Sequence, residues 1–288
     1  MIRLQYQVNL SYEIRDPAGA DFVFNIHAAR TPQQTVEQER LVLNQPVEAE
    51  VATDATTSTR FMRLHANPGP LEVNYTATVT IDHHYADPAT LNEVPVRQTP
   101  LDVLPYIYPS RYCQSDRLLR LASNTFGHLW QGYSRVLAVQ NWVQSHVTFA
   151  SNTSNFNTSA VDTLIEQVGV CRDFTHLMLA LCRALNIPAR IATGTDYGAD
   201  PALGPPDFHA YVEVYLGDRW YIFDASGTGI PMGFLRIGTG RDAADVAFAT
   251  IFGNVTSMAP YIDVQVLEGP GLEVPHHRKD AISTSAAL

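Results

Sequence analysis

The segment Gly169–Leu185 decides the fold and reads GVCRDFTHLMLALCRAL. Its apolar residues recur at offsets of three and four, at positions 174, 177, 178, 181, 182 and 185, which is the spacing of an amphipathic helix. The following segment contains Pro188, which disfavours the helical conformation in the residue before it. We therefore predict a helix that begins close to Cys171 and packs one face into the core.

Cys171 lies where this helix is expected to begin. Its sulfur would lie near the unpaired N–H groups and the positive end of the helix dipole, both of which stabilise a thiolate. A free thiol titrates near about 8.5, and a helix N-terminus lowers this pKa, so such a cysteine is nucleophilic at neutral pH. The backbone N–H of Cys171 is also a candidate donor to an oxyanion, whereas the sequence identifies no second donor.

A predicted hairpin supplies two further candidate residues. The run HAYVEVY begins at His209, a turn follows at residues 216–218, and the run RWYIFD ends at Asp224. Because the two runs pair, both side chains can reach the same end of the sheet. We predict a triad in which Cys171 attacks a carbonyl carbon, His209 moves the proton, and Asp224 orients and stabilises the imidazolium.

The first part of the chain is predicted to be all-β, because apolar residues alternate over positions 4–10 and 71–81 and Pro/Gly-rich turns separate the runs. Prolines at positions 88, 95, 100, 105 and 109 are typical of an interdomain connection. We place an N-terminal β domain in residues 1–100, a catalytic core in residues 101–270 and a flexible tail in residues 271–288.

Beyond the proline-rich connection the period becomes helical. The pattern predicts helices from Ser115, over residues 136–146 and over residues 160–167. A strand over Ala189–Ala192 should lead into a Gly/Pro/Asp-rich loop that ends at Pro206. The run Val255–Leu267 is a candidate for a last strand.

Ordered blocks of this sequence resemble the core of the transglutaminase-like superfamily. They are GVCRDFTHL from Gly169, IPAR from Ile187, DFHAYVEV from Asp207 and WYIFDA from Trp220. The resemblance covers roughly residues 110–255 and is strongest to bacterial proteins described as candidate cysteine proteases, which also carry an N-terminal β domain.

The resemblance implies an α+β fold, with a sandwich-like all-β domain followed by a papain-like core. The nucleophile of that core lies at a helix N-terminus packed on an antiparallel sheet, and the family's catalytic residues fall on Cys171, His209 and Asp224. Two departures can alter the pocket: Arg172 stands where glutamine is frequent, and Ala-Ser-Gly follows Asp224 where many relatives have Pro-Thr.

Three hypotheses for function remain open. The leading one is a cysteine hydrolase that cleaves peptide or side-chain amides of a peptide or protein substrate through a thioester. Transamidation would use the same triad with an amine acceptor, and differs in how well the cleft excludes water and positions amines. The third hypothesis is a noncatalytic binding module that retains the fold. The substrate and the oligomeric state stay open.

Composition limits which classes of partner and cofactor are expected. The formal net charge of −10 disfavours nucleic acid, which basic clusters bind. Three cysteines give no disulfide framework, and no Cys-x-x-Cys or His-Glu-x-x-His motif occurs, so no metal or cofactor is expected. The first residues lack the apolar run of a signal peptide and no later run is long enough to span a bilayer, so we expect a cytoplasmic protein without a membrane partner.

Overall fold

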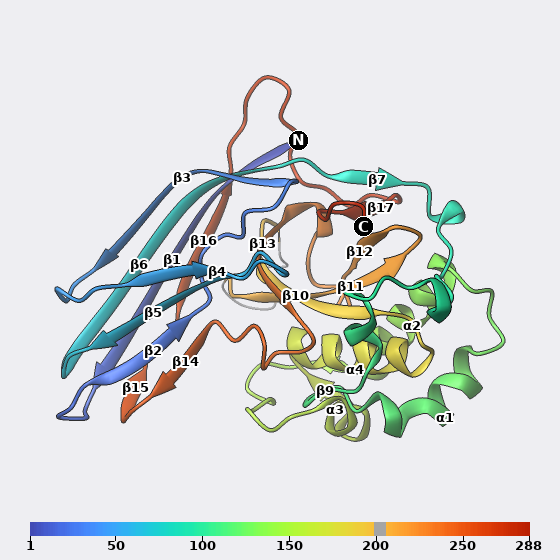
Figure 1. Cartoon of the computed structure of the whole chain (residues 1–288), viewed down its shortest axis with the longest axis horizontal. Helices are drawn as coiled ribbons and strands as arrows, with labels where there is room; N and C mark the ends of the chain where they lie inside the picture. The colour runs from blue at the N-terminus through green and yellow to red at the C-terminus, as the bar shows by residue number, and fades with distance from the viewer. Residues whose placement is uncertain (199–205) are drawn as a thin grey trace.

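The computed structural model describes residues 1–198 and 206–288, and its N-terminal part is a β-sandwich (Figure 1). The strands of the sandwich are β1 (Ile2–Ile14), β2 (Ala20–Phe24), β3 (Gln34–Leu43), β4 (Glu50–Thr53), β5 (Arg60–Ala66), β6 (Gly69–Ile81), β14 (Ala249–Phe252), β15 (Val255–Ser257) and β16 (Tyr261–Val266). One sheet has the order β15-β1-β6-β3, with β16 also paired to β1, and the other has the order β14-β2-β5-β4. Alternate residues of β1 and β6 point into the shared core, as the period-two pattern predicts.

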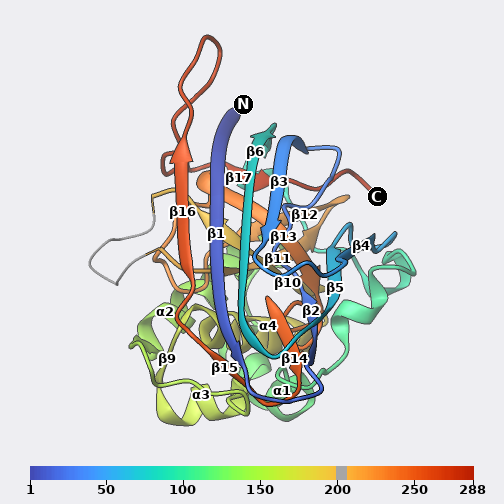
Figure 2. The same cartoon turned by 90° about the vertical axis from the view of Figure 1, so that its left-hand side faces the viewer.

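Three strands of the sandwich come from late in the chain. Strand β14 pairs with β2, and β15 and β16 pair with β1. Figure 2 shows β16 running beside β1. The single strand expected over Val255–Leu267 is thus two strands, and both belong to the sandwich rather than to the core sheet. The segment 249–266 therefore returns from the core to the first sandwich strands.

The second part of the chain combines four helices with a four-stranded antiparallel sheet. The elements are α1 (Ser115–Phe126), α2 (Tyr133–His146), α3 (Ala160–Glu166), α4 (Cys171–Ala184), β10 (Ala189–Asp196), β11 (His209–Leu216), β12 (Arg219–Phe223) and β13 (Phe234–Gly240), in the sheet order β12-β11-β10-β13. The expected α+β fold is confirmed, with Cys171 as the first residue of a helix on an antiparallel sheet. No helix within the described residues is long and apolar enough to cross a membrane.

Short elements connect these layers. They are β7 (His84–Ala86), β8 (Thr148–Phe149), β9 (Val168–Gly169), β17 (Ala281–Ser283), and the 3-10 helices η1 (Pro88–Thr90), η2 (Val96–Gln98), η3 (Leu104–Ile107) and η5 (Pro231–Gly233). Strand β10 extends to Asp196, four residues beyond the strand expected from the sequence, because Thr193 to Asp196 also pair with β13. Residues 199–205, half of the loop predicted to end at Pro206, lie outside the described residues.

Strand β11 is buried along its whole length between two layers. Its residues Ala210, Val212 and Val214 pack in the hydrophobic cluster that contains α4. Tyr211, on the opposite face, packs in the cluster of the sandwich. The core sheet is therefore covered by α4 on one face and by the sandwich on the other, so neither face of β11 meets solvent.

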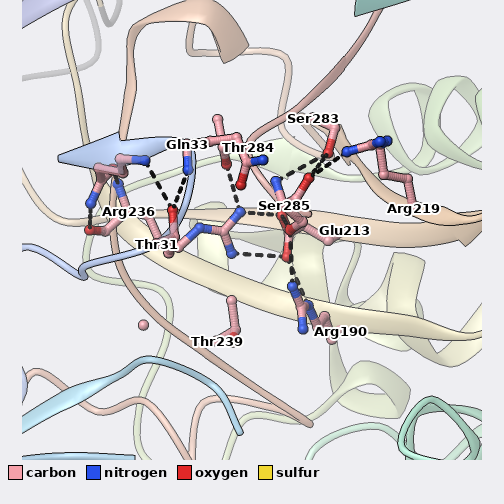
Figure 3. Close-up of polar contacts among 12 residues, drawn as sticks. Thr31, Gln33, Arg190, Glu213, Arg219, Arg236, Thr239, Ser283, Thr284 and Ser285 are labelled. Carbon is pink, nitrogen blue, oxygen red and sulfur yellow. Dashed lines mark hydrogen bonds and ion pairs between the residues drawn. The ribbon is translucent and has the colours of Figure 1, made fainter. Parts of the chain in front are cut away.

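A buried carboxylate links three strands of the core sheet, and the arginine it binds on β13 is also held by the sandwich. Glu213 accepts hydrogen bonds from Arg236 Nη1 at 2.9 Å and from Arg190 Nε at 2.7 Å, and Arg236 Nη2 contacts its other oxygen (Figure 3). The side-chain amide of Gln34, at the start of β3, binds both the N–H and the carbonyl of Arg236. Although burial alone would raise the pKa of Glu213, the two guanidinium groups lower it to about 2.

The C-terminal segment packs onto this cluster. Strand β17 pairs with β7, and the residues from Ala281 to Thr284 are buried. The hydroxyl of Thr284 accepts a hydrogen bond from Arg236 Nη2 at 2.7 Å, and the carbonyl of Ser285 accepts one from Arg219 at 3.0 Å. The prediction of a flexible tail over residues 271–288 is wrong for this segment. No apolar pattern in the sequence reveals this packing. Thr284 and Ser285 are instead held by arginines from distant parts of the chain.

We predict that Glu213→Gln lowers the free energy of unfolding at pH 7 by about 3 to 5 kcal/mol, because it leaves two buried guanidinium groups without their carboxylate. Urea unfolding followed by fluorescence measures this loss. The control is Glu50→Gln, which removes an exposed ion pair with Arg63 and should cost less than about 1 kcal/mol. Equal losses in the two variants would contradict the structural role of Glu213.

The pH dependence of this contribution follows from the lowered pKa. A carboxylate with a depressed pKa stabilises the folded state fully above its ordinary pKa of 4.5, and the contribution is lost as the pH falls toward about 2. The stability difference between wild type and Glu213→Gln should therefore be constant near neutral pH and shrink in acid. A difference that grows as the pH falls would contradict this assignment.

Candidate active site

The polypeptide before Cys171 is held in place by Asp173. The carboxylate of Asp173 accepts a hydrogen bond from the N–H of Val170 at 2.9 Å and another from the hydroxyl of Ser154 at 2.9 Å. A side chain at Gly169 would place its Cβ 2.7 Å from Asp173 Cβ, so only glycine fits there. Asp173 is thus a capping residue. It fixes the backbone on which Cys171, which is partly exposed, presents its sulfur.

His209 and Asp224 meet at one end of the core sheet. His209 opens β11, Asp224 directly follows β12, and His209 Nε2 lies 3.5 Å from Asp224 Oδ1. Asp224 also accepts hydrogen bonds from the N–H of Ser226 at 3.0 Å and the N–H of Gly229 at 2.7 Å. Burial alone would raise the pKa of Asp224, but His209 and these donors outweigh it and lower the pKa.

Cys171 completes the cluster. Its Sγ lies 3.9 Å from the carbonyl oxygen of Phe208, the residue that precedes His209. Burial lowers the pKa of His209, but its interactions with Asp224 and with Cys171 outweigh burial and raise the pKa well above 6.5. The structure therefore brings the three residues predicted from the sequence into one site, with an imidazole that favours its protonated form.

Two residues that the sequence analysis missed lie beside His209. The ring centroids of Tyr211 and His209 are 4.6 Å apart. The Tyr211 hydroxyl donates a hydrogen bond to Asp196 Oδ2 at 2.7 Å. Asp196 is buried, which raises its pKa, and its charge further favours the imidazolium of His209. Positions 209 and 211 share one face of a strand, so Tyr211 was detectable from the period of two. Asp196 was not detectable in this way, because the sequence predicted a loop, and not a strand, at its position.

The other cysteines and His176 are structural. Cys113 and Cys182 are buried, and burial raises the pKa of each thiol to about 12. His176 accepts a hydrogen bond from the N–H of Ala243 at 3.2 Å and stacks on Tyr112, and burial lowers its pKa to about 3. Across residues 1–198 and 206–288, no group of three His, Cys, Asp or Glu side chains is placed to hold a metal ion.

Comparisons with known proteins agree with this architecture. The sequence profile of the transglutaminase-like superfamily matches residues 120–225, and that of the bacterial transglutaminase N-terminal domain matches residues 2–102. The crystal structure of a candidate cysteine protease from Cytophaga hutchinsonii is 39% identical, with a TM-score of 0.90 over 98% of this chain and 97% of that one.

Mycobacterial relatives match a shorter part of the chain. An uncharacterized protein of Mycobacterium leprae is 30% identical over 116 residues, which are 39% of this chain and 42% of that protein. One of Mycobacterium bovis is 27% identical over 115 residues, which are 36% of this chain and 37% of that protein. The match thus spans less than half the length of these relatives.

We predict that Gly229→Ala slows alkylation of Cys171 at neutral pH by about fivefold. The new Cβ would lie 2.3 Å from both Asp196 Oδ2 and Tyr211 Oη, and the N–H of Gly229 would move away from Asp224. Weakening one such hydrogen bond costs about 1 kcal/mol. Intact-mass kinetics with iodoacetamide measure the rate.

Gly269→Ala serves as the control for this substitution, because the Cβ at position 269 meets only the tip of Leu272, at 3.3 Å. It should leave the rate at the wild-type value. An unchanged rate in Gly229→Ala would show that the groups around Asp224 do not affect the reactivity of Cys171.

Proposed function

The chain belongs to the transglutaminase-like superfamily, and we propose that it is a cysteine hydrolase that cleaves peptide or side-chain amides through a thioester on Cys171. One observation supports this proposal above the others. A partly exposed thiol at the first residue of α4 lies beside an imidazole whose pKa is raised by that thiol and by Asp224. An imidazole beside a cysteine in this arrangement can activate the sulfur for nucleophilic attack.

In the first half of the proposed reaction, the Cys171 thiolate attacks the amide carbonyl carbon and forms a C–S bond. The backbone N–H of Cys171 has no acceptor within the described residues and is available to the oxyanion. Because Nε2 of His209 faces Asp224, Nδ1 is the nitrogen left to serve the sulfur and the substrate. Its proton passes to the leaving nitrogen as the C–N bond breaks, which leaves a thioester.

In the second half, water attacks the thioester carbon. His209 accepts a proton from the water, a C–O bond forms, and the C–S bond breaks to release the acid and restore the thiolate. Asp224 stays ionised throughout, because its lowered pKa favours the carboxylate that stabilises the imidazolium. An amine in place of water would give transamidation with the same residues.

The first test compares alkylation of wild type, Cys171→Ala and His209→Ala by iodoacetamide across pH, read by intact mass. We expect alkylation of Cys171 at pH values well below about 8.5, where a free thiol titrates, and none at Cys113 and Cys182, whose raised pKa values and burial protect them. His209→Ala should move the alkylation of Cys171 toward alkaline pH. Slow and equal alkylation of all three cysteines would support the binding module instead.

A second test identifies the acceptor. A tryptic digest of a denatured protein is incubated with the enzyme and a fluorescent primary amine, and products are read by mass spectrometry. We expect new peptide termini or glutamine converted to glutamate, both lost in Cys171→Ala. Peptides that carry the fluorescent amine would instead establish transamidation.

The cytoplasmic location and the exclusion of nucleic acid and membranes as partners stay predictions from the sequence.

A further inference from the structure

A cavity of about 150 Å³ opens beside Cys171 and His209. Its walls include Ile191 of β10 and Ile237 of β13, which are buried, and Val246 from the segment after β13. The aromatic rings of Phe208 and Phe248, also in the lining, stack with centroids 4.8 Å apart. The cavity is thus an aliphatic and aromatic space whose wall contains the sulfur and the imidazole of the candidate site.

The charges in this lining disfavour an ionic occupant. Its described residues include no carboxylate, and those that can carry charge are Arg172, His209 and Cys171. His209 faces Asp224, and it is the partner of Cys171 in the proposed reaction. The guanidinium of Arg172 is bound to Asp173 and to the carbonyl of Asn155, so it is already satisfied. A cationic side chain would find no free counter-ion here, because Cys171 and His209 are already partners, and an acidic side chain would lose its water without a free partner. The occupant is therefore uncharged.

The volume sets the size of the occupant. A cavity of about 150 Å³ lined by leucine, isoleucine and phenylalanine holds one benzene molecule. We propose that this cavity is the subsite for a leucine- or phenylalanine-sized side chain on the acyl side of the substrate, the part retained in the thioester. This inference rests on the proposed function, since it assigns the substrate class of the same site.

The β-sandwich holds one wall of this subsite. Phe248 immediately precedes β14, which pairs with β2, and its carbonyl accepts a hydrogen bond from the N–H of Asn25 at 2.9 Å. Asn25 itself is buried and lies in the cavity lining. The N-terminal domain thus fixes the position of Phe248 relative to Cys171, and substrate selection depends on both domains.

Peptidyl acyloxymethyl ketones test the subsite without a known substrate. The thiolate displaces the carboxylate from the methylene carbon, so a C–S bond forms as a C–O bond breaks. Dipeptidyl probes carry glycine, alanine, leucine, phenylalanine, aspartate or lysine at each of the two positions in turn, with glycine at the other. We expect leucine or phenylalanine at one position to label Cys171 at least about tenfold faster than glycine, aspartate or lysine.

Matched variants test whether the preference for leucine or phenylalanine depends on this cavity. Ala247 is an exposed residue of the lining, so Ala247→Leu fills the mouth of the cavity, whereas the neighbouring Ala244 is exposed outside the lining. The ratio of the leucine-probe rate to the glycine-probe rate should fall about fivefold or more in Ala247→Leu and keep its wild-type value in Ala244→Leu. Phe248→Ala, which removes the aromatic wall, should lower the same ratio.

The outcomes separate the subsite from the chemistry. If iodoacetamide and the glycine probe label Cys171 but leucine and phenylalanine give no advantage, or if the advantage persists in Ala247→Leu and Phe248→Ala, the subsite is overturned and the proposed nucleophile stands. If Cys171 reacts with none of these reagents, the proposed function fails and the subsite falls with it.

Discussion

The burial of β11 on both faces is the constraint on which the rest of the structure depends. One face of this strand packs on α4, which carries Cys171, and the other faces the sandwich. His209 begins the strand, so its imidazole sits at the junction of all three layers. The position of His209, the proposed general base, relative to Cys171, the proposed nucleophile, is therefore set by close packing rather than by a loop.

Charge on β11 is confined to the face turned away from α4. His209 and Glu213 lie on this face four residues apart, and each meets partners from other elements. Glu213 is neutralised by arginines of β10 and β13, whereas His209 meets Asp224 beyond β12. The first group ties three strands of the core sheet together and the second forms the candidate site. The two groups share no partner.

The three candidate residues could be located from the sequence because each lies in an element with a clear local pattern. The helix from Cys171 has an unbroken apolar period, and the hairpin from His209 to Asp224 has a short turn between alternating strands. Asp196 escaped prediction because the pairing that extends β10 to it comes from β13, about forty residues later in the chain. The buried C-terminal segment escaped for a similar reason, since its polar side chains are satisfied only by distant arginines.

The return of residues 249–266 to the sandwich has a consequence for biosynthesis. Strands β1 and β2 emerge from the ribosome before the core. The strands that pair with one edge of each, β15 and β16 for β1 and β14 for β2, are made after the core sheet. Until then, β1 and β2 expose unpaired N–H and C=O groups at a sheet edge, the feature that promotes aggregation. The nascent chain thus depends on a segment made after the core to complete the sandwich, so the sandwich and the core do not mature as independent units.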